Sequence, residues 1–263
     1  MSQLSDALQQ RQAQGKPALI PFVTAGDPSL EGTGRVIDVL INAGADVIEI
    51  GFPYSDPLAD GPVIQASYTR ALATHIKLDD IFAHISKWTS KHPKTPMLGM
   101  VSFSLVFRKG VSAFFDAARQ AGLTGLIIPD LPFEEASKLS SEATARQLAL
   151  VQLVTPATPR DRAQAICQSS TGFVYVVSVT GITGTRTALP AELINQLAEL
   201  RQMTKLPLCV GFGISQSEHV HLLAGHADGI IVGSALVRCL EGDKPFDEKL
   251  AEIGALAREL KLK

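Results

Sequence analysis

The stretch VIEIGFPYSDPLADGP, residues 47–62, begins as an apolar β-strand and continues as a loop rich in proline and aspartate. Strands that are apolar throughout are typical of a parallel sheet that is covered on both faces. Glu49 interrupts this apolar run, and an ionised carboxylate is costly to bury without a partner. The position of Glu49 therefore calls for a functional or a structural reason.

Apolar runs of the same kind recur along the chain and alternate with longer amphipathic stretches. The predicted strands are 18–24, 46–52, 96–102, 125–130, 148–155, 172–178, 206–213 and 228–234. Several predicted helices end at a glycine just before the next strand, at Gly44, Gly122 and Gly225, where a left-handed C-cap forms most easily. Eight such units in one compact length favour a (β/α)8 TIM barrel over a doubly wound sheet.

The N-terminal segment MSQLSDALQQRQAQGK, residues 1–16, predicts an extra amphipathic helix in front of the barrel and is unlike a secretory signal. No linker, low-complexity tract or charge block divides the rest of the chain. We therefore expect residues 1–263 to form one domain, an α/β barrel with an added N-terminal helix.

The composition argues against several classes of protein. With 263 residues and a net charge of −2, the chain has no general electrostatic basis for binding nucleic acid or an anionic membrane. No apolar run reaches the length of about 18 residues that a membrane span needs. Cys167, Cys209 and Cys239 have no metal or redox spacing, and the six histidines lie away from the predicted strand ends. We expect a cytoplasmic protein without a metal.

Glu49 and Asp60 are the candidate catalytic residues. In a barrel the chemistry lies on the loops after the strands, and both residues are expected at the same mouth. Burial should raise the pKa of Glu49 and suit it to proton transfer near neutral pH. The alternative for Glu49 is a structural ion pair within the barrel. For Asp56 and Asp60, which precede proline and glycine, the alternative is ordinary turn chemistry.

The last two predicted strands end in glycines. Gly211-Phe212-Gly213 follows one strand, and Gly233-Ser234 follows the next. Barrels often bind phosphate at these two loops through bare backbone N–H groups, although glycines also serve turns. The loop SVTGITGTRTALP, residues 178–190, has the composition of a mobile lid or of a plain surface connection.

Five stretches together resemble the alpha subunit of tryptophan synthase over essentially the whole chain. They are PFVTAGDP at 21–28, DVIEIGFPYSDPLADGPVIQ at 46–65, GLIIPDLPFEE at 125–135, GFVYVVSVTGITG at 172–184 and VGFGIS at 210–215. The resemblance implies a (β/α)8 lyase of L-tryptophan biosynthesis. Its retro-aldol reaction would cleave indole-3-glycerol phosphate into indole and glyceraldehyde 3-phosphate, with no cofactor.

The resemblance also implies roles for individual residues. Glu49 would be the principal acid and base, protonating the indole ring carbon and assisting the side-chain hydroxyl. Asp60 would accept a hydrogen bond from the indole N–H. The substrate-binding residues that the resemblance implies are Phe22, Tyr175 and Phe212 around the indole, Gly184, Gly213, Gly233 and Ser234 at the phosphate, and Thr183 in a lid that closes against Asp60.

The partner implied by the resemblance is a tryptophan synthase beta subunit in an alpha2beta2 tetramer. The segment MVSFSLVF departs from the family pattern, because Ser102 and Ser104 stand near places where members usually carry tyrosine and asparagine. Val179 stands where some members have arginine. The loop that holds the two serines would help to contact the beta subunit, so a stand-alone lyase that releases free indole is an alternative.

Two readings from other classes compete with the lyase. One is a regulatory module that binds phosphate ligands and activates a partner without chemistry, and intact Glu49 and Asp60 argue against it. The other is an isomerase that acts on a different sugar phosphate in the same barrel. Phe22, Tyr175 and Phe212 favour a planar indole over a bare sugar, although each could serve packing alone.

Overall fold

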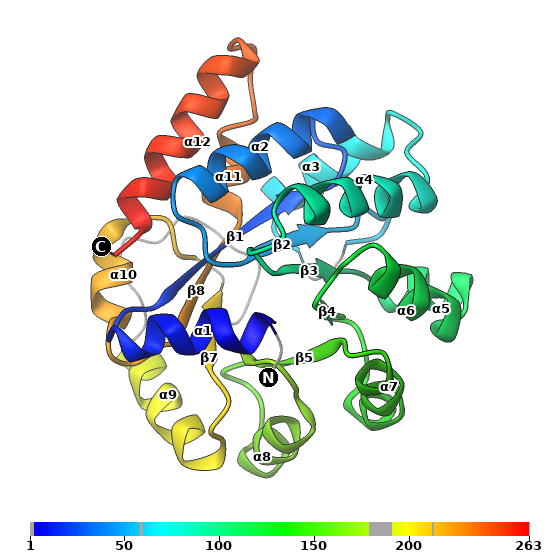
Figure 1. Ribbon diagram of the computed structural model, residues 1–263. Helices are drawn as coiled ribbons and strands as arrows, with labels where there is room; N and C mark the ends of the chain where they lie inside the picture. The colour runs from blue at the N-terminus through cyan, green and yellow to red at the C-terminus, as the bar shows by residue number, and fades with distance from the viewer. Residues whose placement is uncertain (1–2, 58–59, 179–190, 212, 263) are drawn as a thin grey trace.

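The computed structural model describes residues 3–57, 60–178, 191–211 and 213–262. Eight parallel strands pair in sequence order and β8 pairs with β1, so the sheet closes into a barrel (Figure 1). The strands are β1 (Ala18–Thr24), β2 (Ile48–Gly51), β3 (Met97–Met100), β4 (Gly125–Ile127), β5 (Ala149–Val154), β6 (Val174–Val177), β7 (Leu208–Gly211) and β8 (Gly229–Val232).

Helices surround this barrel on the outside (Figure 1). They are α1 (Gln3–Ala13), α2 (Leu30–Asn42), α3 (Pro62–Leu72), α4 (Leu78–Lys91), α5 (Phe103–Lys109), α6 (Val111–Gln120), α7 (Phe133–Ala145), α8 (Arg160–Ser169), α9 (Ala191–Met203), α10 (Ser217–Leu223), α11 (Ser234–Arg238) and α12 (Phe246–Leu260). The predicted (β/α)8 TIM barrel with an added N-terminal helix is confirmed.

Each observed strand lies within its predicted range and most are shorter. The apolar pattern continues beyond the paired residues, as at Phe52 and Ile128, which are buried but lie past the strand ends. Hydrophobic periodicity reports burial, whereas a strand ends where its ladder ends. The glycines predicted to close helices at Gly44, Gly122 and Gly225 have the expected positive φ angles of 103°, 86° and 81°.

Alternating side chains along each strand build two separate cores. On β2, Ile48 and Ile50 face the helices, whereas Val47, directly before the strand, packs in the barrel interior. The two-residue period then points Glu49 and Gly51 inward as well. Glu49 lies beside Phe22 of β1 in the sheet register, and Phe22 belongs to the interior core. The sequence thus places the only polar residue of β2 inside the barrel.

Helix α1 closes the N-terminal end of the barrel. Leu4 and Leu8 are fully buried and pack with interior residues such as Ala149 and Phe173. In Figure 1, α1 lies across the strands at this end. Burying two leucines contributes roughly 3–6 kcal/mol in total, so the helix acts as a stopper for the interior core. The opposite end of the barrel remains available for a site.

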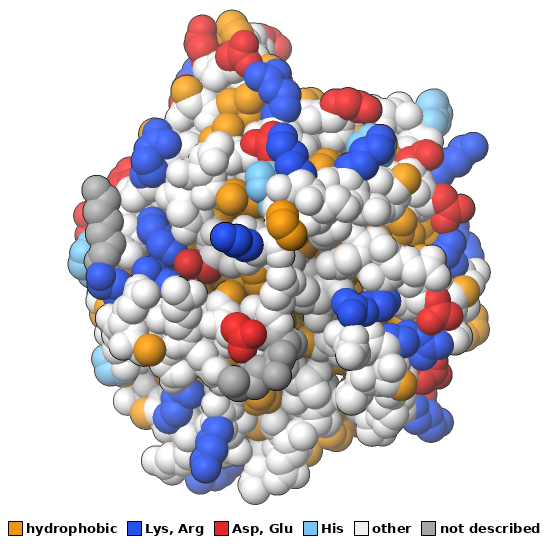
Figure 2. Space-filling model, in the orientation of Figure 1, with side chains coloured by type: hydrophobic (Ala, Val, Ile, Leu, Met, Phe, Trp, Pro, Cys, Tyr) orange, Lys and Arg blue, Asp and Glu red, His pale blue; other side chains and the backbone are white. Residues whose placement is uncertain are grey.

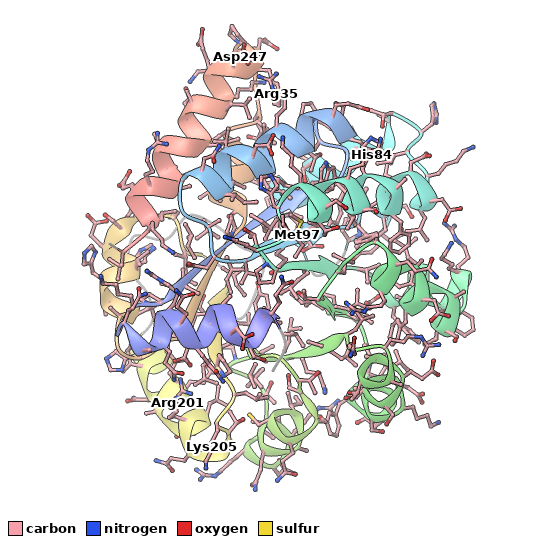
Figure 3. The ribbon with its side chains drawn as sticks, viewed as in Figure 1. Arg35, His84, Met97, Arg201, Lys205 and Asp247 are labelled. Carbon is pink, nitrogen blue, oxygen red and sulfur yellow. The ribbon has the colours of Figure 1, made fainter. Side chains whose placement is uncertain are left out.

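Ion pairs between side chains on the outer surface join neighbouring helices. Helix α12 lies along α2, and Figure 3 shows Arg35 of α2 beside Asp247 at the start of α12, where they form an ion pair. On the face seen in Figure 2, acidic and basic side chains are intermixed. Among the described helices, none has both the length and the apolar character that a membrane crossing requires.

Polar side chains tie the strands together at the N-terminal end of the barrel. Asp228 precedes β8 and accepts a hydrogen bond from Leu208 N of β7 at 2.7 Å. Asp46 precedes β2 and accepts from Leu19 N of β1 at 2.7 Å. Thr171 precedes β6 and accepts from Leu150 N of β5, also at 2.7 Å. Each of these hydrogen bonds supplies an acceptor for a backbone N–H near the start of a strand, where the β-ladder supplies none.

Replacement of Asp228 tests this arrangement. Asp228 is 7% exposed and also pairs with Arg201, so Asp228→Ala leaves Leu208 N–H and the guanidinium without their acceptor. We expect the free energy of unfolding to fall by about 2–4 kcal/mol in urea titrations.

Asp79→Ala is the matched control. It breaks an ion pair with Lys109 in which the Asp79 side chain is 83% exposed, so we expect a loss below about 1 kcal/mol. Equal losses in the two variants would contradict a special role for the strand-start carboxylate.

Candidate active site

A cavity opens at the C-terminal mouth of the barrel. It brings together the predicted site residues Phe22, Glu49, Asp60, Tyr175, Gly213, Gly233 and Ser234. Thr183, Gly184 and Phe212 lie outside the described residues, as do Val179 and Arg186. Residues from five of the eight strand–loop units therefore meet where a barrel enzyme carries its chemistry.

Glu49 supplies one carboxyl group of the cavity. Its residue is 1% exposed, and within the described part of the chain its Oε2 atom has no hydrogen-bond partner. Burial, and after it the charge of Asp60, raises the pKa of Glu49 to about 8. No described basic residue forms an ion pair with Glu49, so the structural alternative finds no support. The side chain can hold a proton at neutral pH and deliver it.

Asp60 supplies the second carboxyl group, from the loop between β2 and α3. It is 6% exposed, and burial followed by the charge of Asp130 raises its pKa to about 6. Gln65 of α3 fixes this loop by donating from Nε2 to Asp60 O at 2.7 Å and to Pro57 O at 3.2 Å. The cavity thus holds two carboxyl groups that titrate apart and can divide acid and base roles.

The structure separates the two aspartates of the loop. Asp60 turns into the cavity, whereas Asp56 lines an outer groove and accepts from Ser55 Oγ at 2.7 Å. Turn chemistry therefore accounts for Asp56 but leaves the burial of Asp60 unexplained. A buried carboxyl group in a cavity is a candidate for function.

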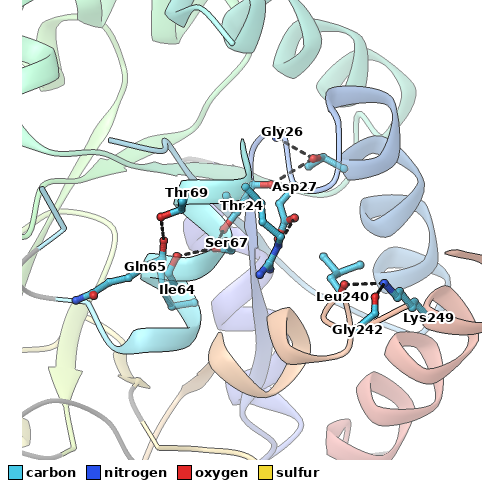
Figure 4. A network of polar contacts seen from close by, with 12 residues as sticks. Thr24, Gly26, Asp27, Ile64, Gln65, Ser67, Thr69, Leu240, Gly242 and Lys249 are labelled. Carbon is cyan, nitrogen blue, oxygen red and sulfur yellow. Dashed lines mark hydrogen bonds and ion pairs between the residues drawn. The ribbon is translucent and has the colours of Figure 1, made fainter. Parts of the chain in front are cut away.

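Helix α3 is anchored so that the loop of Asp60 is held against β1. Thr24 Oγ1 and Ser67 Oγ lie 2.7 Å apart, and Ser67 Oγ donates to Ile64 O at 2.7 Å (Figure 4). Arg70 donates from Nε and Nη2 to the two carboxylate oxygens of Asp27, at 2.9 and 2.7 Å. These contacts fix the position of the helix that begins at Pro62, two residues after Asp60. They therefore limit where the Asp60 carboxyl group can lie in the cavity.

Two inward glycines make room for the aromatic walls. A Cβ atom on Gly51 would lie 2.6 Å from Phe22 Cε2, and one on Gly211 would lie 2.6 Å from Tyr175 Cζ. Both rings therefore lie over bare backbone on a neighbouring strand, with residue exposures of 4% and 3%. Sequence reasoning missed the part played by Gly51. The available signal was a glycine at an inward strand position beside a strand with an inward aromatic residue.

Further apolar residues complete the lining, and sequence reasoning missed them too. They are Gly61, Ile64, Met100, Ile214 and Ile231. Met100 and Ile231 occupy inward positions of β3 and β8, which the two-residue period could have found. Apolar and aromatic walls with a few polar groups are typical of a site for a planar organic ligand.

The far side of the cavity is built from backbone. Gly213 has a φ angle of 80°, which favours glycine, and Gly233 is the N-cap of α11 with Ser234 as the first helical residue. N–H groups in the first turn of a helix have no acceptor within that helix. The side chain of Ser234 adds a hydroxyl at the same place. Backbone of this kind can bind a phosphate, and the phosphate site stays a prediction.

Ser102 and Ser104, which depart from the family pattern, lie in the outer groove that Asp56 lines. Ser102 caps α5 and donates from Oγ to Asp130 Oδ2 at 2.7 Å, and Phe103 N donates to Asp130 Oδ1 at 2.7 Å. Ser104 Oγ lies 2.8 Å from Ser102 Oγ. Tyr54 and Asp56 line the same groove, and Phe107 of α5 is 72% exposed. Ser102 therefore works as a helix cap joined to Asp130.

Within the described residues, no group of three or more His, Cys, Asp or Glu side chains is arranged so that it could hold a metal ion.

Replacement of the buried carboxyl group should stabilise the barrel. An exposed glutamate has a pKa near 4.5, and in the folded chain the pKa of Glu49 is about 8. Between these values the unfolded chain ionises Glu49 while the folded chain keeps it protonated, so the wild type loses stability as the pH rises. Glu49→Gln cannot ionise. We expect its gain in unfolding free energy to grow from near zero at pH 4.5 to about 2–4 kcal/mol at pH 8.

Urea titrations at pH 5, 6.5 and 8 would measure this gain. A difference between Glu49→Gln and the wild type that does not change with pH would contradict a buried, protonated Glu49.

The family model for the tryptophan synthase alpha chain matches residues 8–262. The tryptophan synthase alpha chain of Rhodopirellula baltica is 48% identical over 241 residues, which cover 90% of this chain and 86% of that protein. The one of Synechocystis sp. is 47% identical over 257 residues, which cover 97% and 96%.

Solved structures agree in shape. A protein from Aquifex aeolicus superposes with a TM-score of 0.90 at 33% identity, covering 99% of this chain and 98% of that one. A chain of Mycobacterium tuberculosis tryptophan synthase gives a TM-score of 0.88 at 33% identity, with coverage of 98% and 96%. With the family pattern running through almost the whole sequence and the same barrel in these structures, the chain belongs to the tryptophan synthase alpha chain family.

Proposed function

We propose that Glu49 and Asp60 divide the catalytic work of this lyase between them. The chain is a carbon–carbon lyase of L-tryptophan biosynthesis, which cleaves indole-3-glycerol phosphate into indole and glyceraldehyde 3-phosphate. The observation that supports the division is the pair of buried carboxyl groups that line one cavity. Their pKa values of about 8 and about 6 leave one protonated and the other ionised at pH 7.

In the first step the protonated Glu49 gives its proton to the indole ring carbon that carries the glycerol side chain. The indole ring becomes positively charged, with much of the charge at its N–H. The ionised Asp60 accepts a hydrogen bond from that N–H and stabilises the charge where it develops. Phe22 and Tyr175 hold the ring as flat walls on either side of the cavity.

In the second step the Glu49 carboxylate takes the proton of the side-chain hydroxyl next to the ring. The oxygen forms the aldehyde, the carbon–carbon bond breaks, and its electron pair returns to the ring as neutral indole. Glu49 is then protonated again, so the cycle closes without another group. The N–H groups around Gly213, Gly233 and Ser234 hold the phosphate throughout and keep the product aldehyde in place.

The dependence of cleavage on pH tests this division. Activity should be lost as the pH falls through about 6, where Asp60 becomes protonated, and again as it rises through about 8, where Glu49 loses its proton. We expect a bell-shaped profile of kcat/KM centred near neutral pH. Glu49→Gln should lower kcat by roughly 10³-fold and Asp60→Asn by roughly 10²-fold.

Both variants should still bind glycerol phosphate, because the phosphate wall is untouched. Substantial cleavage by folded Glu49→Gln would remove Glu49 from its assigned role. A fall in activity that comes with a lost phosphate affinity would point to damage of the cavity as a whole.

We also propose a tryptophan synthase beta subunit as the partner, in an alpha2beta2 assembly, with the outer groove as part of the contact. The groove joins the loop of Asp56 to the start of α5, and both the exposed Phe107 and Asp130 belong to this region. Asp130 raises the pKa of Asp60, so a partner cation placed near Asp130 would reach the site electrostatically.

Steady-state cleavage with and without a tryptophan synthase beta subunit tests the partnership. We expect low activity of the isolated chain and a rise of at least tenfold with the beta subunit. High activity that the beta subunit leaves unchanged would instead support the stand-alone lyase that releases free indole. Phe107→Ser should weaken the rise and leave the basal rate of the isolated chain as it was.

A further inference from the structure

Tyr68 of α3 is a buried tyrosine that the mechanism has not used. It is 2% exposed, and it lies on the helix that begins two residues after Asp60. Asp60 is 6% exposed and is the first of the charged groups that raise the pKa of Tyr68. A phenol hydroxyl donates hydrogen bonds and a carboxylate accepts them, so Tyr68 is a candidate donor to Asp60.

The helix directs Tyr68 toward the site. Ile64 lines the cavity, and Tyr68 follows it by four residues, so the two share one face of α3. Helical side chains lean toward the N-terminus of their helix, and α3 begins at Pro62, two residues after Asp60. The Tyr68 side chain therefore extends back toward the Asp60 end of the helix.

Strand β2 fixes the position of the hydroxyl from the other side. A Cβ atom on Gly51 would lie 2.9 Å from Tyr68 Oη, so the hydroxyl approaches bare backbone at the top of β2. Gly51 is the next inward position above Glu49. The hydroxyl thus lies beside the strand that carries Glu49, and the absence of a side chain on Gly51 lets it come so close.

Asp60 has acidic groups around it and no described basic residue that shifts its pKa. The titratable groups that face it are Glu49 on β2, Tyr54 on its own loop, Tyr68 on α3, Asp130 after β4 and Tyr175 on β6. All of them are acids, and no described basic residue is among the groups that shift the pKa of Asp60. Burial and then Asp60 raise the pKa of Tyr68 well above its usual value, so its hydroxyl stays a donor.

We propose that Tyr68 is a positioning residue for Asp60, resting on the function proposed above. When substrate is bound, the Tyr68 hydroxyl donates to one oxygen of the ionised Asp60 carboxylate, and the other oxygen accepts the indole N–H. A carboxylate has room for both bonds. The bond orients Asp60 and favours its ionised form at neutral pH, where that form is needed.

Tyr68→Phe tests the proposal, because it removes the hydroxyl and keeps the ring against Tyr54, whose centroid lies 5.7 Å away. A lost donor should raise the pKa of Asp60, so we expect the acid limb of the kcat profile to move up by about one pH unit. At pH 6 the variant should turn over roughly fivefold more slowly than the wild type, because a smaller fraction of its Asp60 is ionised. At pH 8 the two rates should be nearly equal, since Asp60 is then ionised in both.

The matched control is Thr69→Ala, which removes a hydroxyl from the exposed face of the same helix, where it bonds only to Gln65 O at 3.0 Å. It should leave the pH profile unchanged. Thermal unfolding of both variants shows whether the barrel is intact.

Three other outcomes would overturn the proposal. They are a Tyr68→Phe profile that coincides with the wild type, a loss of the same size at every pH, and a shift that Thr69→Ala reproduces. The function proposed above fails separately, through a wild type without cleavage or an Asp60→Asn variant with full activity. A wild type that cleaves and an inactive Asp60→Asn variant, with no shift in Tyr68→Phe, would remove Tyr68 alone.

Discussion

An ionised carboxylate loses most of its hydration when it enters the interior of a barrel, and this constraint governs Glu49. The side chain is 1% exposed, and Oε2 has no hydrogen-bond partner in the described part of the chain. The site responds by keeping the group protonated, which is the form that an acid catalyst needs. The second carboxyl group, Asp60, lies on a loop and is less deeply buried, at 6% exposed, and its pKa is raised only to about 6.

The remaining features of the cavity follow from the need to keep this acid dry and still admit a ring. Phe22 and Tyr175 exclude water, but two aromatic side chains would fill a small barrel. Gly51 and Gly211 leave room for the two rings, because each ring lies over a glycine of a neighbouring strand. The walls are therefore rigid without closing the cavity. A flat aromatic substrate fits such a slot better than a bare sugar phosphate does.

Most of the fold could be predicted because burial on both faces leaves a strong apolar signal in every strand. Glu49 was predictable for the same reason, since it violates that signal. Gly51 and Tyr68 were not, because their roles depend on neighbours that only the strand register and the depth of α3 define. The outward position of Asp56 and the inward position of Asp60 also required the structure, since both have the sequence context of a turn residue. The roles of Thr183, Gly184 and Phe212 stay predictions.

The two ends of the barrel differ in how far their polar groups have hydrogen-bond partners. At the N-terminal end, Asp46, Thr171 and Asp228 each provide an acceptor for a strand N–H, and Leu4 and Leu8 seal the interior. At the C-terminal mouth, Glu49 remains without a partner for Oε2 among the described residues. Unsatisfied groups lower stability, so they can persist only where the rest of the fold offsets them. A well-tied N-terminal end therefore allows the mouth to hold polar groups whose partners arrive with the substrate.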